Sequence, residues 1–463
     1  MVAGESTHET DLLVIGGGSG GYAAAFRAAE LGIVTTIVER VPSLGGTCLH
    51  SGCIPSKTLL SIAELVRATR DAKAMGIKFG EPKIDVEAVR SWKTGVVGKL
   101  AGGLDALCKK LKVEKLEGFA KFEDSEHVAV EGGNVPRVRS RRVIVATGSK
   151  SIPLPGVNLD TPRLMNSHTA LDFQDIPARL LVVGAGYIGL ELGTVYAALG
   201  STVTVVEMLP TILPGGVDGD LIRVLARRLK DEFEEICLET RVIGMEEIEG
   251  GINVEFDGAN VPKTKTYDKV LVAIGRRPNA RDLQLDRTGA TLDKHGFIKV
   301  NERFQTDDPR IYAIGDVIGN PMLAHKASRE GRVCAEILAG KDSVFEPSSI
   351  PAVVFTNPEI AWTGLTQDEA REQKRDVVTK KIPWSASGRA VSLGRTDGLT
   401  KIIFDKATQR VLGVGMVGPH AGDMIAEGAL AIEMGAVARD VAATIHPHPT
   451  LSETIGEVAR MMV

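Results

Sequence analysis

Two separate segments of the chain show the same succession of apolar and polar patterns. Residues 11–40 read as an apolar strand, a glycine-rich turn, an amphipathic helix and a second apolar strand. Residues 179–208 repeat this plan. A short apolar run that closes on glycines and passes into a helical period is typical of a strand–turn–helix unit in a parallel sheet. The pattern therefore predicts two βαβ units in one chain.

Each unit carries a glycine triplet spaced as G-x-G-x-x-G and a later glutamate at the end of its second strand. The first glycine makes a tight turn, the second lets the backbone approach a pyrophosphate, and the third lets the helix pack closely on the strand. The glutamate accepts hydrogen bonds from ribose hydroxyls. The residues are Gly16, Gly18, Gly21 and Glu39 in the first unit and Gly184, Gly186, Gly189 and Glu207 in the second. Two such sets at equal spacing predict two bound dinucleotides.

The residues after Glu207 bear on which dinucleotide the second unit binds. Glu207 is followed by Met208, Leu209 and Pro210, with no arginine or lysine to pair with a ribose 2′-phosphate. The sequence therefore favours NAD over NADP at this site.

Three further apolar runs close on glycine: RVIVATGS up to Ser149, KVLVAIGRRP up to Pro278 and RIYAIGD up to Asp316. They fit strands that enter a dinucleotide-binding crevice. Asp316 could accept hydrogen bonds from polyol hydroxyls, although taken alone such a residue is more typical of a turn or a helix cap. SKSIPLPGVN, from Ser149, reads as a linker rich in proline and glycine.

We therefore expect an α/β protein with two Rossmann-like dinucleotide-binding domains and a C-terminal α+β domain. The C-terminal part mixes strand-like runs (PAVVF, TKIIF, RVLGVGMVG) with the helical pattern DMIAEGALAIEMGA. The expected boundaries are 1–149 for the first domain, 150–275 for the second, 276–340 for a central segment that returns to the first site, and 341–463 for the C-terminal domain.

Composition and charge bear on whether the protein binds nucleic acid, spans a membrane or is secreted. A net charge of −4 over 463 residues gives no indication of a nucleic-acid partner. No apolar run is long enough to span a bilayer, and residues 1–11 lack the pattern of a signal peptide. Five cysteines do not make a secreted disulfide framework. We expect a cytoplasmic protein without a membrane partner, in which a disulfide is catalytic rather than structural.

Cys48 and Cys53 stand close together within GGTCLHSGCIPSK, while the other cysteines are isolated. A zinc site needs further ligands, and after His50 only the HPH run at 446–448 offers any, so we expect no metal. Two inert thiols or a redox pair remain. Pro55 and the apolar spacing that follows it predict a helix that starts near Cys53, where a thiolate is stabilised and its pKa falls. The position favours a redox pair.

These motifs together resemble those of the class I pyridine nucleotide–disulfide oxidoreductases, and within that family those of the members that oxidise dihydrolipoyl groups. GGTC…GCIPSK, ATGS, GAGYIGLE, AIGRRP, AIGDV with MLAHKA, and HPHPTLSE occur in the family's order along nearly the whole chain. The chain differs from the usual motif at His50 and Ser51, where Asn and Val are common; neither position carries the electron chemistry.

The resemblance implies FAD at the first site, NAD at the second and a dimerisation role for the C-terminal domain. It implies FAD contacts from Gly16, Gly18, Gly21, Glu39, Gly46, Thr47, Lys57, Gly118, Ala120, Thr147, Gly148, Asp316, Met322, Leu323, Ala324 and His325. It implies NAD contacts from Gly184, Gly186, Tyr187, Ile188, Gly189, Glu207 and Gly275.

The resemblance also assigns catalytic roles. Cys53 would face the flavin and Cys48 would exchange with substrate. Lys57 and Glu191 would pair near the flavin ring, and Tyr187 would gate the nicotinamide pocket. From the residues alone, Lys57 and Glu191 read as an exposed charge and a helix-surface carboxylate.

TIHPHPTLSE contains the predicted base. A dithiol must lose a proton near neutral pH, and an imidazole oriented by a carboxylate suits that task. By position in the family, His448 is the base and Glu453 its partner, whereas His446 is a structural neighbour. The family pattern places this segment at the disulfide of the other subunit, which implies a homodimer with shared active sites.

The expected reaction is oxidation of protein-bound dihydrolipoyl groups with NAD⁺, with the lipoyl domain of a 2-oxoacid dehydrogenase or glycine-cleavage complex as partner. One alternative is a family member that reduces a different disulfide with NAD(P)H. A terminal cysteine pair, as expected of a mercuric reductase, is missing, since the last cysteine is Cys334. The other alternative is a nucleotide-binding module whose cysteines form only a staple.

Overall fold

The computed structural model describes residues 7–259 and 261–463. Its contacts divide the chain into two compact units. Unit 1 comprises residues 1–58, 85–152 and 275–346, and unit 2 comprises residues 59–84, 153–274 and 347–463. No helix in the described part of the chain is both long and apolar enough to cross a membrane.

Unit 1 is built on a seven-stranded sheet in the order β3-β2-β1-β6-β5-β4, with β17 also paired to β6. The strands are β1 (Thr7–Ile15), β2 (Thr35–Glu39), β3 (Glu114–Glu117), β4 (Phe119–Phe122), β5 (His127–Glu131), β6 (Arg137–Val145) and β17 (Ile311–Ala313). Strands β3, β2, β1, β6 and β17 run parallel, whereas β5 and β4 continue the sheet antiparallel.

Both faces of the parallel part of this sheet are covered, which explains why its strands read as nearly continuous apolar runs. Along β1, Leu12 and Val14 pack into one core cluster and Leu13 and Ile15 into another. The helices of unit 1 are α1 (Ser19–Glu30), α2 (Gly46–Ser51), the start of α3 (Cys53–Asp71), α4 (Val86–Lys110) and α8 (Ala324–Leu338).

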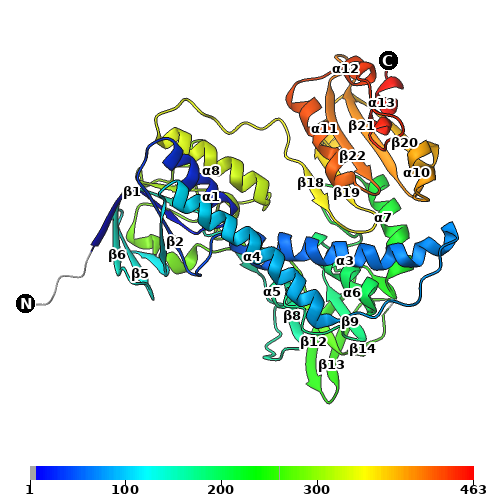
Figure 1. Cartoon of the computed structure of the whole chain (residues 1–463), viewed down its shortest axis with the longest axis horizontal. Coiled ribbons are helices and arrows are strands. Elements are labelled where there is room, and N and C mark those ends of the chain that lie inside the picture. Colours follow the sequence, from blue (N-terminus) through cyan, green and yellow to red (C-terminus); the bar gives the residue numbers. More distant parts are fainter. Residues whose placement is uncertain (1–6, 260) are drawn as a thin grey trace, which may run out of the picture. The chain divides into compact units, whose positions relative to one another are not determined.

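Helices α1 and α8 lie side by side, although they come from opposite ends of unit 1 (Figure 1). Their backbones approach closely at two glycines, because a Cβ added to Gly331 would lie 2.4 Å from the carbonyl oxygen of Gly20. The register of the parallel strands then aligns Ile15 with Val38 and Val145, and Val145 with Ala313. The segments that follow these residues therefore leave the sheet at one edge.

Unit 2 contains a second parallel sheet in the order β11-β10-β9-β15-β8. Its strands are β8 (Leu164–Asn166), β9 (Arg179–Val183), β10 (Thr202–Val206), β11 (Glu235–Cys237) and β15 (Lys269–Val272). Its helices are α5 (Ser167–Leu171), α6 (Tyr187–Leu199) and α7 (Gly219–Glu232). A separate antiparallel sheet joins β12 (Arg241–Ile248), β13 (Gly251–Asp257) and β14 (Thr264–Tyr267).

The C-terminal part of unit 2 is an antiparallel sheet in the order β18-β19-β22-β21-β20, with helix α11 packed on it (Figure 1). The strands are β18 (Ala352–Val354), β19 (Ile360–Gly364), β20 (Val377–Pro383), β21 (Leu399–Asp405) and β22 (Val411–Val417). The helices are α9 (Gln367–Glu372), α10 (Gly388–Ser392), α11 (Ala421–Glu433), α12 (Ala438–Ala443) and α13 (Glu453–Arg460).

The predicted fold class is confirmed. Unit 1 has a sheet with a parallel core and a glycine turn after β1, unit 2 has a parallel sheet with a glycine turn after β9, and the C-terminal part is α+β. The isolated cysteines Cys108, Cys237 and Cys334 are buried, as expected of core fillers. The linker predicted from Ser149 instead begins with a strand, β7 (Ser149–Ser151), which pairs with β16 (Arg276–Pro278). The backbone of β7 pairs with a strand more than a hundred residues further along the sequence, and local composition does not reveal such a pairing. The predicted domain boundaries stay predictions.

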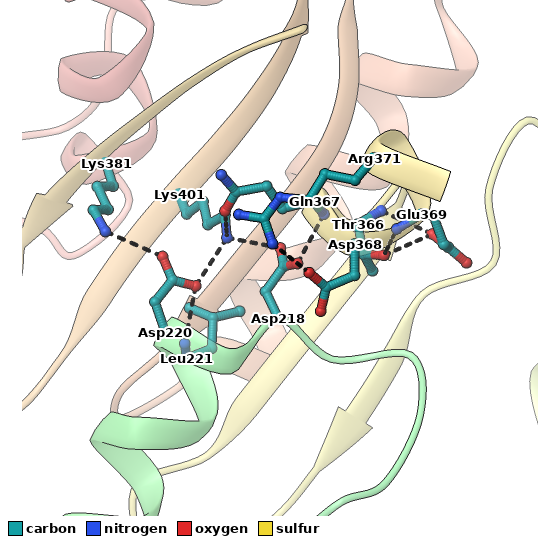
Figure 2. A network of polar contacts seen from close by, with 10 residues as sticks. All are labelled: Asp218, Asp220, Leu221, Thr366, Gln367, Asp368, Glu369, Arg371, Lys381 and Lys401. Carbon is teal, nitrogen blue, oxygen red and sulfur yellow. Dashed lines mark hydrogen bonds and ion pairs between the residues drawn. The ribbon is translucent and has the colours of Figure 1, made fainter. Parts of the chain in front are cut away.

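A buried ammonium group ties α7 to the C-terminal sheet within unit 2 (Figure 2). Lys401 on β21 is 1% exposed, and its Nζ lies 2.8 Å from a carboxylate oxygen of Asp218 and 2.8 Å from one of Asp220. The amide oxygen of Gln367 accepts a third bond at 3.0 Å. Burial alone would raise the pKa of Asp220, but the bonds and charges of Lys401 and Lys381 hold it below its ordinary value.

We predict that Lys401→Met destabilises the protein by about 3–5 kcal/mol, since it leaves the buried Asp218 without its cation and Asp220 with only the exposed Lys381. Lys381→Met is the matched control, because Lys381 is exposed and its bond to Asp220 should contribute at most about 1 kcal/mol. Urea unfolding compares the two variants. The contribution of Asp220 is complete above its ordinary pKa of 3.8 and is lost as the pH falls through its lower native pKa. Equal losses in both variants would contradict this account.

Candidate active site

The first glycine turn joins β1 to α1. Gly16 has a φ of 100°, and a Cβ there would lie 2.5 Å from the carbonyl oxygen of Ala146. A Cβ on Gly21 would lie 1.8 Å from the carbonyl oxygen of Gly16, so only glycine allows the first turn of α1 to pack on the end of β1. Gly18 is the N-cap of α1. A Cβ added to Gly18 would have only the Cα of Gly46 near it, at 3.9 Å, so the space beside Gly18 is otherwise open. The turn can therefore receive a pyrophosphate at the helix N-terminus.

Glu39, at the end of β2, is held beside this turn. One carboxylate oxygen accepts a 2.7 Å bond from the Gly17 N–H and the other a 2.8 Å bond from the Arg40 N–H. The N–H of Gly118 donates to the carbonyl of Glu39 at 2.9 Å, so the start of β4, with the buried Ala120, lies next to the carboxylate. The predicted residues Glu39, Gly118 and Ala120 thus come together at one corner of the sheet.

The ends of β6 and β17 bring Thr147, Gly148 and Asp316 to the same edge. The Thr147 hydroxyl donates to the carbonyl of Asn279 at 2.7 Å, and Gly148 has a φ of 68°. Asp316 accepts a 2.5 Å bond from the Ser149 hydroxyl. The bond joins the first residue of β7 to the segment that follows β17, and the polyol contact of Asp316 stays a prediction. Ser149 ends the ATGS motif and Asn279 follows AIGRRP, but neither was predicted as a site residue, because their partners Asp316 and Thr147 lie more than a hundred residues away.

Helix α8 begins at Ala324, so the predicted residues Met322, Leu323, Ala324 and His325 lie just before or within its first turn. The same helix carries a buried pair that sequence reasoning missed: Lys326 Nζ lies 2.9 Å from Glu330. The other oxygen of Glu330 accepts the N–H of Gly315 at 2.8 Å. Burial raises the pKa of Glu330, against the charge of Lys326. The available signal was the i, i+4 spacing of two charges on an otherwise apolar helix face.

Cys48 and Cys53 lie at the junction of two helices. Cys48 is in α2, Gly52 separates the helices, and Cys53 is the first residue of α3, which confirms that this cysteine lies at a helix N-terminus. A Cβ on Gly46 would lie 2.6 Å from the Cα of Gly18, so α2 begins in backbone contact with the first glycine turn. Gly46 and Thr47, both predicted FAD contacts, therefore lie between that turn and Cys48.

The two thiols interact directly. The pKa of Cys48 is raised, first by its hydrogen bond with Cys53 and then by burial, while the charge of Lys57 acts in the opposite direction. Both cysteines are only half-buried. His50, one of the positions that depart from the family motif, contacts the carbonyl of Leu44 through Nε2 at 2.9 Å and so helps to fix the segment before α2. A contact between two half-exposed thiols at a helix junction is what a reversible disulfide requires.

The second glycine turn repeats the first. Gly184 has a φ of 104°, and its added Cβ would lie 2.5 Å from the carbonyl oxygen of Ala273. An added Cβ on Gly189 would lie 2.1 Å from the carbonyl oxygen of Gly184, whereas one on Gly186 would point into open space. Glu207 accepts the N–H groups of Ala185 and Leu209 at 2.8 and 2.9 Å. In both turns the glutamate accepts the N–H of the residue after the first glycine and an N–H from just beyond its own strand, so both turns fit a dinucleotide.

The remaining nucleotide-site predictions fall in different places. Tyr187 and Ile188 open α6, and Tyr187 is exposed, while its role over the nicotinamide pocket stays a prediction. Gly275 belongs to unit 1, where its carbonyl accepts the N–H of Ile152 at 3.0 Å.

Lys57 lies in unit 1 and Glu191 in unit 2, where Glu191 is buried and accepts the Phe355 N–H at 3.0 Å. The pairing of Lys57 with Glu191 stays a prediction, as does the role of Gly275.

His448 and Glu453 form the predicted contact. Nδ1 of His448 lies 2.9 Å from one oxygen of Glu453, and the other oxygen accepts the Thr450 N–H at 2.8 Å. These two contacts, led by the Thr450 N–H, lower the pKa of Glu453. The His448 side chain is 80% exposed, and within 7–259 and 261–463 its Nε2 has no partner. An ionised carboxylate on Nδ1 leaves Nε2 free to take up a proton from outside.

His446 is in a different environment. Its side chain is 7% exposed, Nε2 lies 2.7 Å from Glu427 on α11, and Nδ1 lies 3.1 Å from the carbonyl oxygen of Thr444. With both ring nitrogens engaged, His446 is a poorer candidate for a base than His448. The described residues contain no cluster of three or more histidine, cysteine, aspartate or glutamate side chains that could hold a metal ion.

Comparison with known proteins gives a family for this arrangement. A family model described as pyridine nucleotide-disulphide oxidoreductase matches residues 10–331, and the dimerisation domain of the same family matches residues 350–459. Dihydrolipoyl dehydrogenase from Haemophilus influenzae is 45% identical over 455 residues, which cover 98% of this chain and 95% of the relative. The protein of the same name from Thermus scotoductus is 45% identical and is covered over 97% of its length.

Two solved structures show the same fold at lower sequence identity. LpdA from Mycobacterium tuberculosis superposes with a TM-score of 0.90 at 27% identity, and the match covers 98% of this chain and 100% of that one. The HOCl-induced flavoprotein disulfide reductase RclA from Escherichia coli gives a TM-score of 0.87 at 26% identity, over 97% and 99% of the two chains.

We predict that NAD⁺ is strongly preferred over NADP⁺ and that Glu207 causes the preference. Glu207→Ser should lower kcat/KM for NAD⁺ by about 10–100-fold, the loss expected for charged hydrogen bonds to the ribose, and should lower the NAD⁺/NADP⁺ ratio. Steady-state kinetics with both nucleotides measure this.

Glu39→Ser is the matched control, since it removes the equivalent carboxylate from the first turn. It should weaken FAD retention and leave the NAD⁺/NADP⁺ ratio unchanged. Equal use of both nucleotides by the wild-type protein would contradict the assignment of Glu207.

Proposed function

This chain belongs to the pyridine nucleotide-disulphide oxidoreductase family, and on that premise we propose that it is a dihydrolipoyl dehydrogenase. FAD and NAD are its cofactors, and Cys48 and Cys53 form its redox-active disulfide. The observation that carries the proposal is the direct contact of Cys48 with Cys53 at the start of α3, in backbone contact with a dinucleotide turn through Gly46 and Gly18. Whole-chain identity of about 44–45% to proteins named dihydrolipoyl dehydrogenase supports the substrate class.

The chemistry begins with proton transfer. His448 Nε2 removes the proton from one thiol of a dihydrolipoyl group, and Glu453 stabilises the resulting imidazolium. The lipoyl thiolate attacks the Sγ atom of Cys48, so the Cys48–Cys53 bond breaks and Cys53 leaves as a thiolate. The second lipoyl thiol then displaces Cys48 from the mixed disulfide and its proton passes to the leaving Cys48 sulfur, while the first proton remains on His448. The lipoyl group is released as a disulfide, and its two electrons remain in the cysteine pair.

The cofactor chemistry completes the cycle. When bound, FAD accepts the two electrons of the cysteine pair and passes them as a hydride to NAD⁺. The first glycine turn, Glu39 and Asp316 would bind FAD, and the second turn with Glu207 would bind NAD. Cys53 is the cysteine we assign to the flavin side and Cys48 the one that meets substrate. Lys57 with Glu191 would adjust the flavin ring, and Tyr187 would cover the nicotinamide pocket.

The dimerisation domain supports a homodimer. Large apolar side chains lie exposed on this part of unit 2, among them Leu430 on α11, Met434 directly after it, and Ile445, which is 94% exposed and directly precedes His446. Such side chains on one domain are typical of an interface. We propose that this surface pairs two copies and that His448 of one copy serves the cysteine pair of the other.

The proposed partner is a lipoyl domain of a 2-oxoacid dehydrogenase or glycine-cleavage complex, and the proposed location is the cytoplasm. The alternative is a reductase for another disulfide, as the likeness to RclA illustrates. The higher identity to the dihydrolipoyl dehydrogenases favours the first reading. A steady-state assay with dihydrolipoamide and NAD⁺, set against NAD(P)H with lipoamide or glutathione disulfide, tests the choice. Faster turnover of glutathione disulfide would overturn the proposal.

We predict that Cys48→Ser abolishes turnover of dihydrolipoamide but leaves FAD bound, because Cys48 meets substrate and does not build the glycine turn. Turnover assays, with flavin absorbance after gel filtration, measure both properties. Cys108→Ser is the control, since Cys108 is a buried core residue outside the motif. It should keep most of the activity. Turnover near the wild-type rate in Cys48→Ser would rule out the redox assignment.

We predict that His448→Gln slows oxidation of the dithiol by about 10²–10⁴-fold, the usual range for loss of a general base. Reduction of bound FAD by NADH should survive, because that step takes no proton from the dithiol. Glu453→Gln should have an intermediate effect, and His446→Gln a much smaller one than His448→Gln. Rapid-mixing measurements separate the two half-reactions. If His446→Gln were the more damaging change, or if both half-reactions slowed together, the base would be misassigned.

A further inference from the structure

A line of buried polar groups connects the core of the C-terminal domain to the helix that carries Glu453. Trp384 belongs to a short helix, η5 (Trp384–Ala386), that follows β20, Thr400 lies on β21, and Thr454 lies in the first turn of α13. All three residues are 0% exposed. Their side chains form consecutive hydrogen bonds: Trp384 Nε1 to Thr400 Oγ1 at 2.9 Å, and Thr400 Oγ1 to Thr454 Oγ1 at 2.8 Å.

The direction of these bonds is fixed by the chemistry of the groups. An indole N–H only donates, so Trp384 donates to Thr400. The carbonyl of Leu451 only accepts, so the hydroxyl of Thr454 donates to it, at 2.8 Å. The hydroxyl hydrogen of Thr400 must then point to Thr454. Each hydroxyl accepts one bond and donates one, and the chain runs in a single direction from the indole to the Leu451 carbonyl.

The indole at the start of this chain cannot turn. A Cβ on Gly398 would lie 2.3 Å from the Trp384 ring, and one on Gly418 would lie 2.1 Å from it. The backbone of two segments thus presses against the ring from close range. Leu451, whose carbonyl ends the chain, also packs its side chain in the cluster of Trp384 and Ala390. Both ends of this chain of hydrogen bonds are therefore anchored in the same part of the core.

The far end of this chain of hydrogen bonds lies beside the proposed base. Thr454 directly follows Glu453, and its backbone N–H also donates to the Leu451 carbonyl at 3.1 Å. Glu453 in turn contacts His448 and the Thr450 N–H. The turn that carries the carboxylate is thus fixed to the core by two bonds from one residue.

We propose that Trp384, Thr400 and Thr454 are positioning residues for the His448–Glu453 pair. None of them touches substrate. They hold the first turn of α13 so that Glu453 meets Nδ1 and His448 presents Nε2 outward. Misplacement of a catalytic group by about 1 Å can cost about 10²-fold in rate, so a buried chain that fixes this turn bears directly on dithiol oxidation. This inference rests on the proposed function, in which His448 is the base.

The test uses the full-length protein with FAD bound. Thr454→Val removes the hydroxyl and keeps the shape of the side chain. It should slow dithiol oxidation by about 10–100-fold and change the pH dependence of that half-reaction, while FAD reduction by NADH stays within about twofold of the wild-type rate. Thr454→Ser, which restores the hydroxyl, should recover most of the lost rate. If Thr454→Val does not fold, Thr454→Ala serves the same comparison.

Thr363→Val is the matched control. Thr363 is 1% exposed on β19 of the same sheet, and its hydroxyl donates to Ser349, away from α13. This change should leave both half-reactions near the wild-type rates. Equal slowing of both half-reactions in Thr454→Val, no slowing, or no recovery in Thr454→Ser would overturn the positioning role.

The His448→Gln variant keeps the two proposals distinguishable. If His448→Gln slows dithiol oxidation but Thr454→Val does not, the positioning chain is wrong and the base assignment stands. If His448→Gln itself has no effect on that half-reaction, the proposed base is wrong.

Discussion

The close approach of helix and strand at the two glycine turns is the constraint on which the rest of the structure depends. At Gly21 a side chain would begin 1.8 Å from the carbonyl oxygen of Gly16, and at Gly189 one would begin 2.1 Å from that of Gly184. Only glycine permits these contacts, and they bring the helix N-terminus to the end of its strand. The N–H of the residue after the first glycine can then donate to Glu39 or Glu207. Nucleotide geometry is thus set by backbone packing before any ligand arrives.

The same kind of contact carries the redox pair. Gly46 begins α2 against the backbone of Gly18, which leaves Cys48 within the helix that starts at the turn. Gly20 and Gly331 let α1 and α8 approach in the same way, so that α8, with Glu330 bonded to Gly315, holds the strand end that bears Asp316. A side chain at any of these glycines would push apart elements that carry chemistry.

The parts of the fold and site that could be predicted share a local signal. Each of these signals lies within about thirty residues, so periodicity and turn chemistry reveal it. They are the glycine triplets, the strands that end on glutamate and the helix from Cys53. Most of the missed features are pairs of distant residues, whereas Lys326 and Glu330 lie only four residues apart. Lys401 meets Asp218, Ser149 meets Asp316, and β7 pairs with β16, each across more than a hundred residues. A single sequence contains no local trace of such contacts, because tertiary packing alone decides which buried polar groups meet.

The exposed side chain of His448, the proposed base, illustrates why the distant contacts matter. A side chain that is 80% exposed has little packing of its own to fix its orientation. For His448 that orientation comes from Glu453, which is fixed by the Thr450 N–H and by its place at the start of α13. The helix is fixed in turn by Thr454, whose hydroxyl and N–H both donate to one carbonyl in the core. The placement of the solvent-facing imidazole thus originates in a buried interior, and a local motif such as HPHPTLSE indicates the proposed base without revealing what holds it in place.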